Sequence, residues 1–217
     1  MGRKKDVPET IIFCMAIILA RMLWIHRRDR HLADIRYGNP EECRQAEEWA
    51  AVVRENMEQK GLAEYLMKDY QYTELLTPED LNNEQLLQAK MTGMMRDLHR
   101  YLHLAPGCTL RVRFDRDHSM ARAGQINYAR RIIDIFPRNE YTAETLMAVL
   151  AHETAHYFLY QNGIGDPDIG LNEKYTDTAA CLIGLSSYML EGNVGYLKKR
   201  QFIAVRNSLY AYRNRHA

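Results

Sequence analysis

The sequence predicts an α+β protein that is mostly helical and contains a small antiparallel sheet. From residue 39 onward, apolar residues recur mainly at helical spacing. Between residues 109 and 136 the pattern changes to alternation and short apolar runs, which are typical of strands. With 217 residues, the chain can form one domain with a sizeable core and an extension. We expect three parts: an apolar N-terminal helix at 1–31, a helical segment at 39–104 and a core at 105–217.

The first part contains a stretch with the composition of a membrane helix. Residues 8–25 are apolar in their main run apart from Arg21, and basic residues lie on both sides. A helix that begins at Pro8 is about long enough to cross a bilayer, and Arg21 is near enough to its end to reach the headgroups. No small-residue cleavage site follows. We therefore expect a single membrane anchor; a packed core helix and a cleaved signal peptide are the alternatives.

Net charge and cysteine content narrow the partners and the compartment. The formal net charge is +1, which gives no electrostatic reason to expect a nucleic-acid partner. The four cysteines are scattered without a C-x-x-C pair, so neither a thiolate metal site nor a disulfide framework is indicated. Unpaired thiols favour a reducing compartment. We expect a membrane-associated protein whose main domain lies in the cytoplasm, with a soluble cytoplasmic protein as the alternative.

Helices are predicted across the second part. Asn39-Pro40 is a helix start, and the buried face of that helix continues to Gly61. A short helical piece is expected at 62–68. Thr77-Pro78-Glu79-Asp80 resembles a capping box and predicts a second long helix that Pro106-Gly107 ends. His99 and His103 are four residues apart on this helix, and without a carboxylate partner we interpret them as surface or core histidines.

Three strands are predicted next. Leu110, Val112 and Phe114 alternate with polar residues, which indicates a half-buried strand. Residues 124–127 and the run Ile132, Ile133, Asp134, Ile135 and Phe136 predict two more strands around a turn at Ala129-Arg130.

The stretch Ala151-His152-Glu153-Thr154-Ala155-His156 carries the chemistry. It lies in an apolar run between a cap at Thr142 and a stop at Asn162-Gly163, which predicts a helix. His152 and His156 then share one face, with side chains roughly 5–6 Å apart, so both imidazoles can bind one zinc ion. Glu153 points about 100° around the axis, where a general base for a metal-activated water belongs. The alternative is that both histidines are ordinary helix residues.

A second motif follows. Asn172-Glu173-Lys174-Tyr175-Thr176-Asp177 opens a helical run that continues to Leu190 and ends at Gly192. H-E-x-x-H followed by N-E-x-x-x-D resembles the gluzincins, the thermolysin-like zinc metallopeptidases. The resemblance implies His152, His156 and Glu173 as ligands of one Zn²⁺, Glu153 as general base, and Asp177 as the carboxylate that holds a ligand histidine.

The resemblance covers roughly residues 120–190 and also implies the fold and the substrate. A small sheet directly before the H-E-x-x-H helix is the order of zincin folds, and residues 132–136 would then be the edge strand that pairs with an extended peptide. An internal hairpin strand is the alternative. Further matches to compact, uncharacterised bacterial predicted zincins are Thr176-Asp177, Ala179-Ala180, Gly184 and Met189-Leu190.

The ligand set also agrees with the chemistry of zinc. Three protein ligands leave one position of a tetrahedral zinc open for water, which is the catalytic arrangement. Asp177 lies one helical turn beyond Glu173, on the correct face to hold a histidine. The sequence therefore predicts a zinc metallopeptidase that acts on a polypeptide substrate.

Two other functions stay open at this point. The first is a catalytically inactive zincin-like domain that acts by interaction, with zinc structural or absent. The second is a regulatory peptidase with a single partner as substrate. The larger gluzincins supply an oxyanion donor from a later segment, and this chain has only His216 as a histidine after Asp177. Tyr157, Tyr175 and Tyr188 are the candidates for that role.

Overall fold

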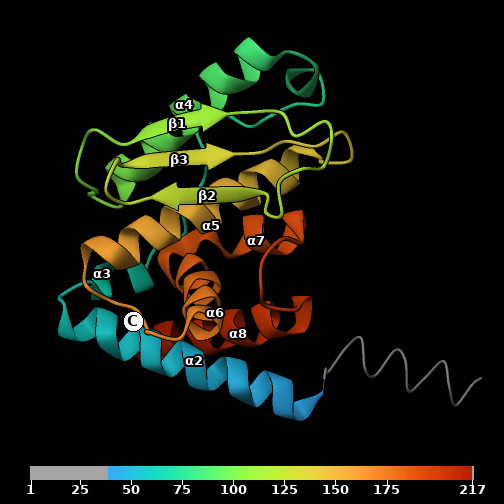
Figure 1. The fold of residues 1–217 in the computed structure, drawn as a ribbon. Helices are drawn as coiled ribbons and strands as arrows, with labels where there is room; N and C mark the ends of the chain where they lie inside the picture. Colours follow the sequence, from blue (N-terminus) through green and yellow to red (C-terminus); the bar gives the residue numbers. More distant parts are fainter. Residues whose placement is uncertain (1–38, 217) are drawn as a thin grey trace, which may run out of the picture. The chain divides into compact units, whose positions relative to one another are not determined.

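A computed structural model describes residues 39–216, which form a mostly helical structure around one three-stranded sheet (Figure 1). The α+β prediction is confirmed at this level. From Glu41 onward the chain forms one compact unit. Buried side chains of the first long helices and of the last helix belong to the same hydrophobic core.

The first helices agree with the sequence pattern, with one correction. Helix α2 (Pro40–Gln59) buries the predicted face, and α3 (Ala63–Leu66) follows it. The next long helix, α4 (Glu84–Tyr101), does not begin at Thr77. Asp80 accepts hydrogen bonds from the backbone N–H and the hydroxyl of Thr77, and this closes a separate 3₁₀ turn, η1 (Asp80–Asn82). Asn83 then caps α4 through the N–H of Leu86.

The sheet is mixed, so the prediction of an antiparallel sheet is wrong for one of its two pairings. Strand β3 (Ile132–Ile135) lies between β1 (Thr109–Val112) and β2 (Gly124–Asn127). It is antiparallel to β2, its hairpin partner, and parallel to β1. A long connection joins β1 to β2, and these two strands do not pair with each other. Strand β3 lies between them and runs parallel to β1.

Helix α5 (Ala143–Gln161) is the centre of the molecule. Thr142 caps it by accepting the N–H of Thr145, and 15 of its 19 residues are buried. Such a helix must be covered on all sides. The sheet lies on one side of α5, and the C-terminal helices lie on the other (Figure 1).

The C-terminal helices are α6 (Ile169–Ala180), the π-helical turn η2 (Cys181–Leu185), α7 (Ser186–Gly192) and α8 (Lys199–His216). The predicted continuous run to Leu190 is interrupted at Gly184, where φ is +92°. A Cβ atom there would lie 2.6 Å from the carbonyl oxygen of Lys68. Only glycine permits this close approach, and the carbonyl of Gly184 accepts the N–H of Tyr70.

The predicted membrane localisation needs correction. None of the helices in residues 39–216 is both long enough and apolar enough to cross a membrane. The stretch on which the anchor was predicted, residues 8–25, lies outside the described residues.

His99 is a core residue, in agreement with one of the two interpretations of the His99 and His103 pair. Its ring stacks on Tyr157 of α5 at a centroid distance of 5.5 Å, and its Nε2 has no hydrogen-bond partner within residues 39–216. Burial lowers the pKa of His99 to about 4. The imidazole is therefore neutral in the folded protein at pH 7.

This burial predicts acid sensitivity. Below pH 6.5, unfolded His99 takes up a proton that the folded protein resists until about pH 4, so stability falls as the pH falls through this window. The lowering of the His99 pKa from 6.5 to about 4 corresponds to roughly 3 kcal/mol of unfolding free energy. In urea unfolding at pH 7 and pH 4.5, we expect His99→Phe to lose about 2–3 kcal/mol less stability than the wild type over this interval. Equal losses in both proteins would contradict this account.

Candidate metal centre

Helix α5 brings His152 and His156 together as their four-residue spacing requires. Both side chains point to the same side of the helix, with ring centroids 4.6 Å apart and planes perpendicular. Both are almost fully buried, at 9% and 8% relative exposure. Both residues lie in α5, a helix with 15 of its 19 residues buried, so packing on several sides of the helix orients the pair.

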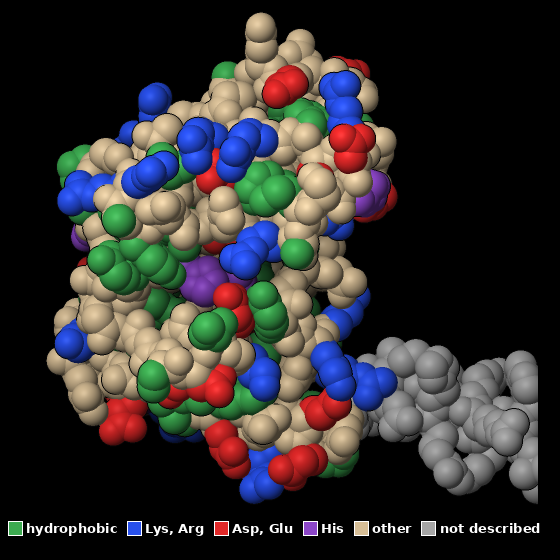
Figure 2. Space-filling model, viewed as in Figure 1, with side chains coloured by type: hydrophobic (Ala, Val, Ile, Leu, Met, Phe, Trp, Pro, Cys, Tyr) green, Lys and Arg blue, Asp and Glu red, His purple; other side chains and the backbone are tan. Residues whose placement is uncertain are grey.

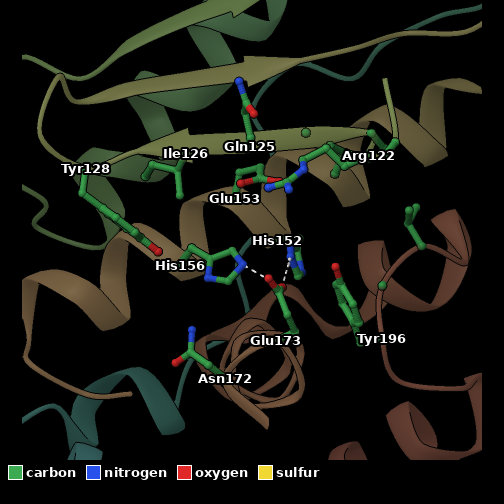
Figure 3. Close-up of a pocket in the computed structure, with 16 residues that line it drawn as sticks. Arg122, Gln125, Ile126, Tyr128, His152, Glu153, His156, Asn172, Glu173 and Tyr196 are labelled. Atoms are coloured by element: carbon green, nitrogen blue, oxygen red, sulfur yellow. Dashed lines mark hydrogen bonds and ion pairs between the residues drawn. The ribbon is translucent and has the colours of Figure 1, made fainter. Parts of the chain in front are cut away.

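Helix α6 supplies Glu173 to the same point. Gly163, with φ of +61°, ends the turn after α5, and Asp168 caps α6 by accepting the N–H of Leu171. Glu173 Oε2 then lies 3.2 Å from His152 Nε2 and 2.9 Å from His156 Nε2 (Figure 3). One ligand atom from each of these three residues lies within 4.8 Å of the others.

The outer nitrogens of both imidazoles are occupied, which determines their tautomers. His152 Nδ1 lies 2.7 Å from Asp177 Oδ1 and donates to that carboxylate. His156 Nδ1 lies 2.9 Å from Thr176 Oγ1. The Thr176 hydroxyl already donates its hydrogen to the carbonyl of Asn172, so it accepts from His156. In the neutral state both rings therefore present an Nε2 lone pair to Glu173.

Three acceptors thus converge on one point, and this arrangement fits a cation. Burial disfavours a charge on His152, but hydrogen bonds to Asp177 and Glu173 outweigh it and raise the pKa of His152 to about 10. Burial is likewise outweighed at Glu173, where the two imidazoles lower the pKa to about 2. The site therefore favours positive charge between these side chains. Two imidazoles and one carboxylate are a donor set of catalytic zinc sites.

Asp177 also has a role that the sequence did not predict. Its second oxygen accepts the backbone N–H groups of Tyr196 and Leu197 in the loop between α7 and α8. Gly195 permits this contact, because a Cβ atom there would lie 2.6 Å from Asp177 Oδ2. One carboxylate therefore orients His152 and fixes the loop that carries Tyr196.

Glu153 lies beside the three acceptors with a free carboxylate. It is 5% exposed, and within residues 39–216 it has no hydrogen bond or ion pair. Burial raises the pKa of Glu153, partly opposed by the two histidines. Strand β2 passes directly over it: a Cβ atom on Gly124 would lie 2.7 Å from Glu153 Oε1. Glycine at this position makes room for the carboxylate beneath the strand.

A cavity of about 330 Å³ opens above the centre. Figure 2 shows histidine in a recess of the surface, with basic and hydrophobic side chains around it. Among the residues that line the cavity are Tyr128, Tyr196 and Arg122 (Figure 3). The ring of Tyr196 stacks on His152 at 6.0 Å. Burial and the charge of Glu173 raise the pKa of Tyr196, so its phenol keeps its proton at neutral pH.

The tyrosines named from the sequence as oxyanion donors lie elsewhere. None of Tyr157, Tyr175 and Tyr188 lines this cavity. Tyr157 stacks on His99, and Tyr188 accepts the N–H of Tyr72. Tyr196 was missed, although the turn Asn193-Val194-Gly195 before an aromatic residue was a signal for a loop. Arg122 had no signal in the local sequence.

The predicted substrate strand also needs correction. Ile132, Ile133, Asp134 and Ile135 belong to β3, which is paired on both sides and has no free edge, and Phe136 is buried just after it. Asp134 is bound by Arg111 and Arg113 on the side of β1. Within the described residues, the free edge at the cavity belongs to β2, whose residues 124–126 line it.

Comparison with models of known protein families, with curated proteins and with solved structures found no match to this chain. The geometry of the site and the two sequence motifs therefore carry the functional argument.

Proposed function

We propose that this chain is a zinc-dependent metallopeptidase with a zincin-like fold, similar to the gluzincins. One observation carries the proposal: three acceptor groups converge within 4.8 Å beside a buried carboxylate that has no partner of its own in the described structure. His152, His156 and Glu173 would hold the zinc. The order of sheet, H-E-x-x-H helix and Glu173 helix supports the assignment.

Each residue around the cavity then has a chemical task. Zinc held by His152, His156 and Glu173 would polarise the scissile carbonyl and lower the pKa of a water molecule to about 7. Glu153 takes the proton of the attacking water and delivers it to the departing amine. The Tyr196 hydroxyl donates a hydrogen bond to the carbonyl oxygen as negative charge develops there.

The free edge of β2 provides the means of holding a peptide. Its outward N–H and C=O groups can pair with an extended backbone, as in other cases of strand addition. Because residues 124–126 line the cavity, a peptide paired with them passes over the three acceptors. A peptide bond would then lie within reach of Glu153.

A direct test uses the purified protein and a panel of unstructured peptides. We expect hydrolysis by the zinc-loaded protein, loss of hydrolysis on chelation, and recovery when zinc is added back, because the cation is required for the chemistry. Mass spectrometry identifies the products. If the zinc-loaded protein cleaves no peptide of the panel, a peptidase that acts on unstructured peptides is refuted.

A further inference from the structure

Arg122 is a charged residue at the centre whose role the peptidase chemistry leaves open. It lies just before β2, is exposed, and lines the cavity beside Glu153 and Tyr196 (Figure 3). Within residues 39–216 it makes no hydrogen bond and no ion pair. Two other arginines differ in this respect: Arg111 of β1 is bound to Asp134, and Arg138, in the loop after β3, is bound to Asp115. The Arg122 guanidinium is therefore available to a ligand.

The charges around the cavity favour an anionic ligand at this end. Among the residues that line it, Arg122 is the only lysine or arginine in the described part of the chain. Two carboxylates, Glu153 and Glu173, also line it. Glu173 lies at the metal position, where a bound divalent cation would offset its charge, whereas the Glu153 carboxylate is buried beneath Gly124 of β2. The exposed charged side chain at the rim of the cavity is the Arg122 guanidinium, a group that binds carboxylates through two parallel hydrogen bonds.

The opposite end of the cleft has a different character. A second cavity of about 320 Å³ adjoins the first, and Tyr128, His156 and Asn172 line both. Its wall contains the stacked rings of Tyr128 and Tyr160, and its charged group is Asp166. No lysine or arginine of the described chain lines this second cavity. An acidic residue is thus repelled from this end and attracted to the Arg122 end.

The direction of β2 relates these two ends to the two sides of the scissile bond. Arg122 precedes Gly124 at the start of β2, and Tyr128 follows its last residue. Antiparallel pairing is the more stable arrangement per residue. A peptide that pairs antiparallel with β2 has its N-terminal part near Tyr128 and its C-terminal part near Arg122.

We propose that Arg122 selects substrates with a carboxylate on the C-terminal side of the scissile bond. This inference rests on the proposed peptidase function. An acidic side chain and a free C-terminal carboxylate present the same chemistry to the guanidinium. Peptides that carry the two groups separately distinguish these sources.

The test measures kcat/KM on matched peptides that differ at one position shortly after the cut, with Glu, Gln or Lys there. We expect the zinc-loaded wild type to prefer Glu over Gln by about 10-fold, the size of one charge-assisted contact. Arg122→Gln removes the preference, and Arg122→Glu shifts it to Lys. A further pair of peptides ends shortly after the cut with a free acid or an amide. A preference for the acid in this pair alone assigns the terminal carboxylate as the ligand.

Controls separate this role from the alternatives. Arg130→Gln, in the exposed β2–β3 turn outside the cavity, should keep the wild-type preference. If Arg122→Gln slows all peptides equally, charge selection is refuted. A wild type that cleaves Glu and Gln peptides equally also refutes it.

A binding measurement makes the inference independent of turnover. The same peptides are titrated into zinc-loaded Glu153→Gln protein, and binding is followed by fluorescence anisotropy. If the Glu153→Gln protein binds peptides charge-selectively but the wild type hydrolyses none of them, the role of Arg122 stands and the peptidase function is refuted. Binding without charge selection would overturn the role of Arg122, whatever the activity.

Discussion

Glu153→Gln is expected to reduce peptide hydrolysis by about 10²–10⁴-fold, the usual contribution of a general base. The amide has nearly the size of the carboxylate but accepts no proton from water at neutral pH. Glu153 makes no hydrogen bond or ion pair in the described structure, so the change breaks no contact there. It also removes a buried charge, and the fold should keep or gain stability.

The measurement is the rate of peptide cleavage with zinc in excess, together with zinc affinity. Zinc affinity should stay near that of the wild type, because Glu153 is not among the three converging groups. Glu144→Gln is a matched control, since it makes the same change in an exposed residue in the first turn of the same helix. Activity of Glu153→Gln within a few-fold of the wild type would exclude Glu153 as the base.

Glu173→Gln is expected to weaken zinc binding by about 100-fold or more. Loss of a hydrogen-bond partner of a ligand costs about 10–100-fold in affinity, and loss of a direct ligand should cost at least as much. The two imidazoles are the main stabilising partners of Glu173, whose pKa they lower to about 2. A neutral amide there cannot offset the charge of the metal.

Competition with a coloured zinc chelator measures this affinity. Glu47→Gln, an exposed acidic residue of α2, provides the matched control. We expect its affinity to equal that of the wild type. An unchanged affinity in Glu173→Gln would remove Glu173 from the ligand set and leave the two histidines without a third partner.

The sequence predicted the features of the site that depend on local spacing. Four residues along a helix place His152 beside His156, and four residues also place Asp177 on the face of Glu173. Helix caps at Thr142 and the buried face of α2 follow from equally local rules. These predictions hold because the helical repeat alone determines which residues share a face, whatever the rest of the chain does.

Features set by contacts between distant segments were not predictable in this way. Alternation shows which face of a strand is buried but says nothing about its neighbours, so the central place of β3 was missed. Tyr196 reaches the site because Asp177, nineteen residues earlier, binds its backbone N–H. Arg122 reaches it because β2 crosses α5 at Gly124. In each case the deciding contact lies far away in sequence.

The zinc content of the purified wild-type protein decides whether His152, His156 and Glu173 form a zinc centre. After incubation with zinc and dialysis against metal-free buffer, elemental analysis should give about one zinc per chain, and close to none for a His152→Ala, His156→Ala double variant. A wild type without zinc, or a double variant that retains it in full, would contradict a metal centre formed by these residues.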